Sequence, residues 1–175
     1  MAELIADLLT VSRLEQRTLS LKKQETSLEE LVQGLILEFQ PFLRASNVQI
    51  ELNAQKDLPK IYLDPFQIRL VIENLLDNAI RYIREKGEIK IKLERKGKNI
   101  YFEVKDNGVG IPKEDRKYIF QKFFRSENAL KYQTQGTGLG LYIAKAITEK
   151  SGGKIGFESE ENKGSTFWLT LPITH

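Results

Sequence analysis

Hydrophobic residues recur with two different periods along this chain of 175 residues, and the switching between the two periods restricts the fold more than any other feature. A period of three to four residues indicates a helix with one apolar face, whereas strict alternation indicates a strand with one buried face. The first period predicts helices at residues 2–17, from Ser27 onward, from Asp64 to about Ile83 and from Gly138 to Gly152, and a further short helix is expected near 113–119. Alternation predicts strands at 48–52, 61–63, 88–94, 100–105, 155–157 and 167–171.

Two of the predicted helices begin with residues that cap a helix N-terminus. Ser27 precedes Glu30 by three residues, which is the spacing of a capping box. Asp64 precedes Pro65, at the first helical position, and Gln67 completes a second box. The second of these is the clearest helix start in the chain.

The order of the elements predicts an α/β fold of two layers, a sandwich in which three main helices lie on one face of a mixed sheet of about five strands. Each main helix has one apolar face to bury. The strands at 88–94 and 100–105 are joined at Gly97 and read as an antiparallel hairpin, whereas a parallel neighbour needs a crossover connection. A hydrophobic content of 41% suits one globular domain with a short appendage.

Composition excludes several kinds of chemistry. The chain has no cysteine, and its single histidine is the terminal His175, so thiolate sites and histidine acid–base catalysis are not expected. The 27 basic and 24 acidic side chains are interspersed, so we expect no nucleic-acid partner. No apolar run approaches the roughly 18 residues that span a bilayer, and Met1 does not begin a basic signal sequence.

The third predicted helix carries an unusual polar stripe. Asn74, Asn78, Arg81 and Tyr82 fall at i, i+4, i+7 and i+8, and therefore lie along one side of the helix. Asparagine is a middling helix former, so two of them one turn apart in an apolar helix need an explanation. A binding surface is one explanation, and a solvated face is the other.

Two glycine-containing segments follow. In the first, Asp106 ends an alternating strand and precedes Asn107-Gly108-Val109-Gly110, which reads either as an ordinary turn or as a binding loop. In the second, Gly136-Thr137-Gly138-Leu139-Gly140 opens an apolar helix, where free N–H groups and the helix dipole favour an anion such as phosphate. The second segment is not a P-loop, because no Lys-Ser or Lys-Thr follows it, and it is a poor dinucleotide fingerprint, because a polar loop and not a strand precedes it.

Taken in order, the segments NLLDNA, DNGVGI, IFQKFF and GTGLGL resemble the N, G1, F and G2 boxes of the catalytic domain of sensor histidine kinases. That domain belongs to the ATPase superfamily of DNA gyrase, the ninety-kilodalton heat-shock chaperone and the mismatch-repair ATPases. The resemblance covers about Ser27 to Pro172. It implies a Bergerat-type fold that binds ATP and Mg²⁺ between the helical layer and a mobile lid.

The resemblance also implies roles for individual residues. Asn78 matches the Mg²⁺ ligand, and Asn74 would line the same phosphate site. Arg81 matches a basic residue that contacts the phosphates, Tyr82 matches an aromatic residue beside the nucleotide, and Arg125 matches an arginine directed at the γ-phosphate.

The glycine segments would hold the two ends of the nucleotide. Asp106 matches the carboxylate that accepts the adenine amino group, and Gly108, Gly110 and Ile111 belong to the loop that approaches the base. Residues 126–135 would form the lid, and its phosphate end would consist of Gly136, Thr137, Gly138, Leu139 and Gly140. One departure from the family pattern follows Tyr82. The family commonly has Thr or Ser and Pro after this tyrosine, whereas this chain has Ile83-Arg84-Glu85.

The position of Asn74 separates two reactions within the superfamily. Members that activate water carry a glutamate there as general base, four residues before the Mg²⁺ asparagine. An amide cannot accept a proton at neutral pH, and Glu73 is about 100° away around the helix. We therefore expect a kinase that positions ATP for a nucleophile from another domain. A nucleotide-binding sensor module without kinase activity and a hydrolytic ATPase are the alternatives.

The expected domain layout follows from the same resemblance. Residues 1–20 look like the end of a dimerisation hairpin helix and a linker, and residues 21–175 would be the ATP-binding catalytic domain. The phosphoacceptor histidine would lie on the missing part of the hairpin. The expected partners are that dimerisation domain, in a full-length homodimer that is either free or membrane-anchored, and the receiver domain of a response regulator. The expected compartment is the cytoplasm, because ATP is intracellular.

Overall fold

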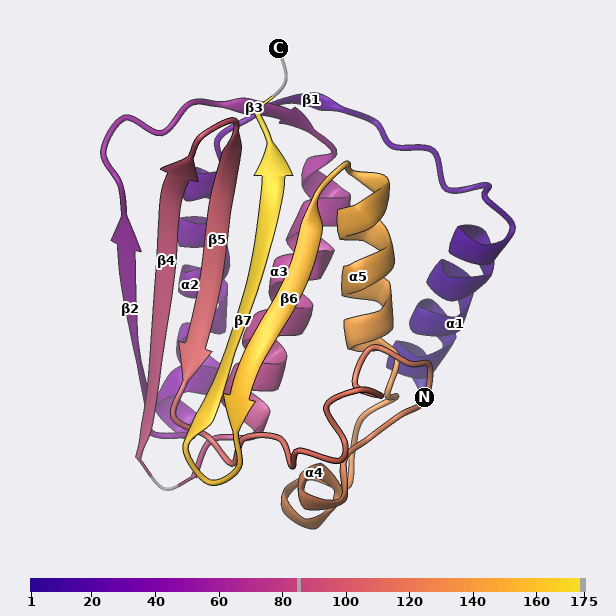
Figure 1. The fold of residues 1–175 in the computed structure, drawn as a ribbon, viewed down its shortest axis with the longest axis vertical. Coiled ribbons are helices and arrows are strands. Elements are labelled where there is room, and N and C mark those ends of the chain that lie inside the picture. Colours follow the sequence, from indigo (N-terminus) through magenta and orange to yellow (C-terminus); the bar gives the residue numbers. More distant parts are fainter. Residues whose placement is uncertain (85, 174–175) are drawn as a thin grey trace.

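The computed structural model describes residues 1–84 and 86–173 and contains a five-stranded sheet with the order β2-β4-β5-β7-β6 (Figure 1). β2 runs parallel to β4, and each of the other neighbouring pairs is antiparallel. The predicted mixed sheet is therefore confirmed. Its strands are β2 Val48–Ala54, β4 Gly87–Lys96, β5 Asn99–Asp106, β6 Lys154–Glu160 and β7 Gly164–Pro172.

Three long helices cover one face of the sheet, as predicted, and the core lies between the two layers (Figure 1). Phe102 and Ile91 from the sheet and Leu35, Leu75 and Ile143 from the helices are almost completely buried there. A fourth helix stands beside α5, at the side of the molecule opposite to β2 (Figure 1). The covering helices are α2 Leu28–Ala45, α3 Pro65–Arg81 and α5 Gly140–Lys150, and the fourth is α1 Ala2–Glu15.

Ser27 and Asp64 cap their helices as predicted, but Gln67 does not complete the second capping box, because its buried Oε1 has no hydrogen-bond partner among the described residues. The Ser27 hydroxyl accepts a hydrogen bond from the Glu30 amide at 3.3 Å. The Asp64 carboxylate accepts from the amides of Phe66 and Gln67 at 3.0 and 3.1 Å, and its second oxygen accepts from the Lys22 amide at 2.7 Å. Asp64 therefore caps α3 and also anchors the segment that leads from α1 into the domain.

Strand 61–63 is the one predicted strand that leaves the main sheet. As β3 Ile61–Leu63 it pairs with β1 Gln24–Thr26 in a separate two-stranded antiparallel sheet. β1 was not predicted, because a strand of three polar residues shows no hydrophobic alternation.

The segments after β5 differ most from the sequence-based expectation. Residues 113–119 form consecutive turns rather than a helix, because their amides bond three residues back, as from Asp115 to Pro112 and from Tyr118 to Asp115. Within the polar stretch 126–135 lies a short helix, α4 Glu127–Tyr132, which Ser126 caps. α5 begins at Gly140 rather than Gly138, because Gly138 has a φ of +72°.

Smaller differences concern helix ends. α1 ends at Glu15 and α3 ends at Arg81, each two residues earlier than predicted. None of the helices in the described ranges combines the length and the apolar character of a membrane span. Two residues discussed above lie outside the described residues. They are Glu85, which belongs to the segment that departs from the family pattern, and the terminal His175.

Candidate functional site

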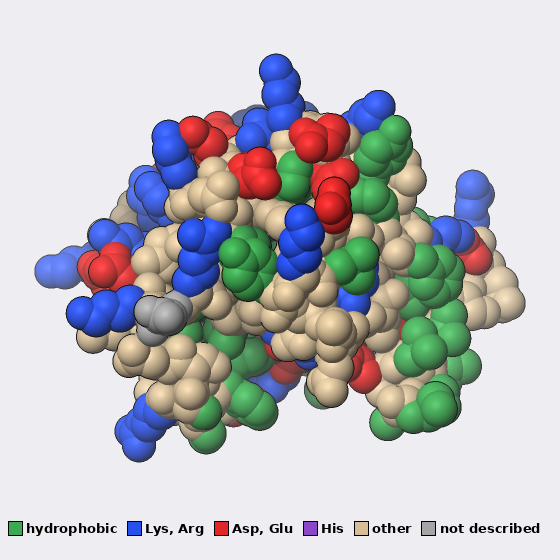
Figure 2. All heavy atoms as spheres, turned by 90° about the horizontal axis from the view of Figure 1, so that it is seen from below, with side chains coloured by type: hydrophobic (Ala, Val, Ile, Leu, Met, Phe, Trp, Pro, Cys, Tyr) green, Lys and Arg blue, Asp and Glu red, His purple; other side chains and the backbone are tan. Residues whose placement is uncertain are grey.

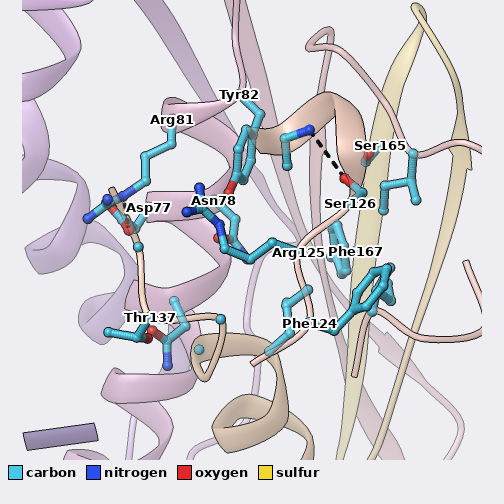
Figure 3. Close-up of a pocket in the computed structure, with 18 of the residues that line it drawn as sticks. Asp77, Asn78, Arg81, Tyr82, Phe124, Arg125, Ser126, Thr137, Ser165 and Phe167 are labelled. Carbon is cyan, nitrogen blue, oxygen red and sulfur yellow. Dashed lines mark hydrogen bonds and ion pairs between the residues drawn. The ribbon is translucent and has the colours of Figure 1, made fainter. Parts of the chain in front are cut away.

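A cavity opens between α3, the start of α5 and the ends of β5 and β7, with the segment 124–138 along its other side (Figure 3). It holds about 990 Å³ of space, including the part open to solvent. Figure 3 shows the labelled α3 side chains on one side, Ser165 and Phe167 of β7 on another, and Arg125 reaching in between. The α3 side of the cavity is polar, while the sheet contributes the polar Asp106 and Ser165 together with the apolar Phe167.

The polar stripe of α3 faces this cavity and not solvent. Asn74, Asn78, Arg81 and Tyr82 all line it. The Asn74 Nδ2 atom is buried and has no hydrogen-bond partner among the described residues. The Asn78 side-chain amide likewise makes no hydrogen bond with a described residue. Buried polar groups without partners are uncommon in proteins, so this stripe is suited to a polar ligand.

Arg81 is already engaged by carboxylates. Its Nε donates to Asp77 Oδ2 at 2.5 Å, and its guanidinium lies 3.6 Å from the carboxylate of Glu3 on α1. Burial raises the pKa of Asp77, and the adjacent Arg81 acts in the opposite direction. The sequence did not single out Asp77, because an acidic residue four positions before an arginine is common on solvated helix surfaces.

Asp106 is fixed at the end of β5 with only 8% of its surface exposed. Its Oδ1 accepts hydrogen bonds from the amides of Gly108 at 2.8 Å and Ser165 at 3.3 Å. Burial raises the pKa of Asp106 to about 6, and these two amides oppose that rise. The other carboxylate oxygen makes no hydrogen bond with a described residue and remains available to a ligand.

The loop after Asp106 packs closely against the backbone of Tyr82 and of Glu160. A Cβ on Gly108 would lie 2.5 Å from the Tyr82 carbonyl oxygen, and one on Gly110, where φ is +66°, would lie 2.0 Å from the Glu160 carbonyl oxygen. The Ile111 amide donates to the Ser159 hydroxyl at 2.8 Å. These glycines therefore allow close approach of one backbone to another.

The second glycine segment forms the opposite end of the cavity. Gly136 and Gly138 have φ values of +137° and +72°, and Gly138 accepts a backbone hydrogen bond from Phe123 at 2.9 Å. α5 then begins without a side-chain cap. Its first residue, Gly140, lines the cavity, and a Cβ there would lie 3.0 Å from Asn74 Oδ1. The first turn thus directs uncapped N–H groups toward this end, which favours an anion.

The lid segment is held by its own backbone carbonyls. The Arg125 guanidinium donates to the carbonyls of Gln133, Thr134 and Gln135, with distances of 2.8 Å to Thr134 and 3.2 Å to Gln135. Asn128 in α4 donates to the Gly110 carbonyl at 2.8 Å. These contacts bind the lid to itself and to the loop after β5.

All the sequence-predicted site residues except Gly108 and Leu139 line the cavity. Gly108 supports it from behind by donating its amide to Asp106. Leu139 is fully buried in the core. The residues that sequence reasoning missed include Glu3 and Asp7 of α1, Asp77 and the apolar lining from Val109, Ile119, Phe124, Ala129, Leu141 and Phe167. Only their three-dimensional packing distinguishes these apolar residues from ordinary core.

Comparisons with known proteins identify the family to which the chain belongs. The family model described as histidine kinase-, DNA gyrase B- and HSP90-like ATPase matches residues 63–175. The adaptive-response sensory kinase SasA of a Synechococcus species is 36% identical over 174 residues, which are 99% of this chain and 46% of that kinase. The chain spans less than half the length of the curated relatives it matches.

Two solved structures are similar over almost the whole chain. Full-length ShkA in complex with AMPPNP has a TM-score of 0.86 and 26% identity, over 98% of this chain and 35% of that one. The histidine kinase ThkA in complex with the response regulator protein TrrA has a TM-score of 0.77 and 28% identity, over 99% of this chain and 49% of that one. The chain belongs to the family of histidine kinase-, DNA gyrase B- and HSP90-like ATPases and is homologous to the ATP-binding catalytic domains of sensor histidine kinases.

Proposed function

We propose that this chain binds ATP with Mg²⁺ and acts as the catalytic domain of a sensor histidine kinase. The observation that carries the proposal is the convergence on one cavity of the amide-bearing helix α3, the acidic end of β5 and the glycine-led start of α5. ATP needs an acceptor for its adenine amino group at one end and donors with a cation for its phosphates at the other, and the cavity offers them at opposite ends.

The adenine would lie against Asp106. The free oxygen of this carboxylate is an acceptor for the exocyclic amino group, while Gly108 and Ser165 hold the other oxygen in place. The neighbouring lining from Ile111 and Phe167 provides apolar surface for the base. A hydrogen bond to an ionised acceptor contributes about 1.5 to 3 kcal/mol.

The triphosphate would lie between α3 and the start of α5. Asn78 would hold Mg²⁺, because an amide oxygen suits a hard cation that keeps several waters and bridges phosphates. Bound Mg²⁺ supplies charge neutralisation. The unpartnered amide of Asn74 and the N–H groups of the first turn of α5 would contact phosphate oxygens, and the match to the family assigns Arg81 and Arg125 to the same end.

The reaction would be in-line transfer of the γ-phosphoryl group to a histidine nitrogen. A bond forms between that nitrogen and the γ-phosphorus while the bond to the bridging oxygen of ADP breaks, and the imidazole N–H proton passes to water. This chain contributes positioning and electrostatic stabilisation. Asn74 is unable to act as the general base that hydrolysis requires, which favours transfer over ATP hydrolysis.

The remaining parts of the proposal concern the parent protein. The acceptor histidine would belong to a dimerisation domain that continues from residues 1–20, and residues 21–175 would be the catalytic domain. The parent kinase would form a homodimer, work in the cytoplasm and pass its phosphoryl group to the receiver domain of a response regulator. A response regulator is the partner of the similar kinase ThkA.

Calorimetric titration of ATP with Mg²⁺ into the unmodified chain and into Asp106→Ala tests the proposal. We expect the unmodified chain to bind ATP and the variant to bind it about ten- to a hundredfold more weakly, because it loses a charge-assisted hydrogen bond. Glu51→Ala, which removes an exposed carboxylate from β2, is the control and should bind as the unmodified chain does. Equal ATP binding by Asp106→Ala would refute the adenine assignment, and sustained phosphate release by the unmodified chain would favour a hydrolytic ATPase.

A further inference from the structure

Two carboxylates on α1, which lies outside the helices that cover the sheet, reach the phosphate end of the cavity. Glu3 and Asp7 are one turn apart on α1, and both line the cavity. Asp7 Oδ2 accepts a hydrogen bond from the Thr137 hydroxyl at 2.6 Å. Glu3 Oε1 lies 3.6 Å from the Arg81 guanidinium. Glu3 therefore contacts a residue that the proposed function assigns to the triphosphate, and Asp7 contacts Thr137, which the family resemblance places at the phosphate end of the lid.

These contacts already place the carboxylates of Glu3, Asp7 and Asp77 along the phosphate end of the cavity. Arg81 already pairs with Asp77, so Glu3 is the second carboxylate on one guanidinium. Burial raises the pKa of Asp7, against the Thr137 hydrogen bond, and the nearby charge of Glu3 raises it further. A triphosphate added beside Glu3 and Asp7 would meet repulsion from both, in surroundings that screen charges less than water does.

α1 is attached loosely enough to move away. Only Val11 of its residues is buried, and Ile5, Leu8 and Leu9 remain exposed on its outer side. Figure 2, which views the molecule from the α4 end, shows hydrophobic side chains gathered at the edge where α1 lies. Its other polar attachment is the exposed ion pair between Glu15 and Lys122, and such pairs are worth little.

We propose that α1 is an intramolecular competitor of the ATP triphosphate. In the docked position Glu3 and Asp7 take up the Arg81 and Thr137 contacts that phosphate oxygens would otherwise make, so ATP binding and α1 docking exclude each other. This inference rests on the proposed function of the cavity. One consequence is that bound ATP weakens the docking of α1 on the catalytic domain. By thermodynamic linkage, docked α1 lowers the affinity for ATP by the factor by which ATP weakens docking.

The double variant Glu3→Gln with Asp7→Asn removes both charges while keeping side-chain size. We expect its affinity for ATP with Mg²⁺ to rise about five- to twentyfold, because the triphosphate no longer meets the partly screened repulsion of two carboxylates. Its affinity for adenosine, which has no phosphate, should not change. Glu51→Gln, which removes one carboxylate from the exposed side of β2, is the control and should leave both affinities unchanged.

The outcomes distinguish this inference from the function on which it rests. Unchanged ATP affinity in the double variant, or an equal rise for adenosine and ATP, overturns competition at the phosphate end but leaves ATP binding intact. Absence of ATP binding in both the unmodified chain and the double variant overturns the proposed function together with the inference.

Amide hydrogen exchange on the unmodified chain gives a second measurement that requires no variant. We expect ATP with Mg²⁺ to accelerate exchange in the backbone of α1 and adenosine to leave it unchanged, because only the triphosphate displaces the helix. Slower exchange in α1 with ATP would mean that the helix clamps the nucleotide, and this result would overturn the inference.

Discussion

The two ends of the cavity are built in different ways. At the end formed by Asp106 and Gly110, buried backbone and side chains are locked together across β5, β6 and β7. At the end formed by Arg81, Arg125 and Thr137, the polar groups are exposed or half-buried, and the protein's own carboxylates and carbonyls occupy them. The first end is preformed, whereas the second must exchange its internal contacts before it can bind a ligand.

This difference suits the two ends to different tasks, one to recognition of the base and the other to regulation of phosphate binding. A preformed contact requires little ordering when a ligand binds, so the Asp106 end is suited to fixing which base is accepted. Groups that already have partners can be released or retained by movements elsewhere, so the other end is suited to responding to α1 and the lid.

The largest difference between the two ends should appear when a methyl group is added to their glycines. Gly110→Ala forces a positive φ and places its Cβ 2.0 Å from the Glu160 carbonyl oxygen, so we expect a loss of about 3 kcal/mol or more in unfolding free energy. Gly136→Ala, whose Cβ would meet only the Arg125 side chain at 3.6 Å or more, should lose about 1 to 2 kcal/mol.

Gly97→Ala is the matched control for Gly110→Ala, because the two glycines have φ values of +61° and +66°. It has nothing within 4 Å of its added Cβ, so it isolates the cost of the backbone conformation. Urea denaturation measures all three. Equal losses for Gly110→Ala and Gly97→Ala would show that the Asp106 end is able to relax, and the contrast between the two ends would fail.

A smaller effect concerns the charge of Asp106. Because burial raises its pKa from 3.8 to about 6, the folded chain favours the protonated form. The resulting stability is fully present below pH 3.8 and is lost as the pH rises through about 6. Asp106→Asn lacks this titration, so at pH 7 we expect it to be more stable than the unmodified chain by about 2 to 3 kcal/mol while binding adenosine more weakly.

Unfolding free energies of both proteins between pH 4 and pH 7 measure this effect. The gap between them should widen as the pH rises. A constant gap would show that Asp106 titrates alike in the folded and unfolded chain, and the Asp106 end would then not be as strongly desolvated as its burial indicates.

The smallest effect is expected at the lid. Arg84 donates to Asn162 in the β6–β7 turn, and its guanidinium lies 5.6 Å from the centre of the Tyr132 ring on α4. Both contacts are exposed, so Arg84→Ala should change the unfolding free energy by less than about 1 kcal/mol. Amide exchange in α4 should nevertheless become faster, whereas Arg95→Ala on the far β4–β5 hairpin should leave α4 unchanged. Unaltered exchange in Arg84→Ala would mean that the Arg125 and Asn128 contacts order the lid without Arg84.

The sequence predicts the parts of the fold whose stability comes from a regular apolar face. The sheet, α2 and α3 follow from hydrophobic period and from caps such as Asp64, whose function is local. β1 and α4 were not predicted, because segments of three and six residues are too short to show a hydrophobic period. Both also make contacts with distant segments. The segment 113–119 begins with five charged residues, so it lacks an apolar face on which a helix would pack, and it forms turns instead.

The same reasoning explains what was missed at the site. Asn74, Asn78 and Asp106 were recognised because their residue types are unusual at those positions and because the four boxes resemble a known family. Glu3 and Asp7 look like ordinary solvated charges on a helix. They reach the cavity only because α1 stands beside α5, and that packing has no signature in the local sequence.

The close fit between the β6–β7 turn and the loop after β5 restricts where this domain can tolerate extra residues. Hairpin tips are usually permissive sites for insertion. Here a Cβ on Gly164 would lie 2.1 Å from the Asp106 carbonyl oxygen, and Asn162 donates its amide to Val109 at 2.7 Å. Lengthening this tip would shift the adenine loop, whereas the open tip at Gly97 is the better place to graft a tag or a reporter.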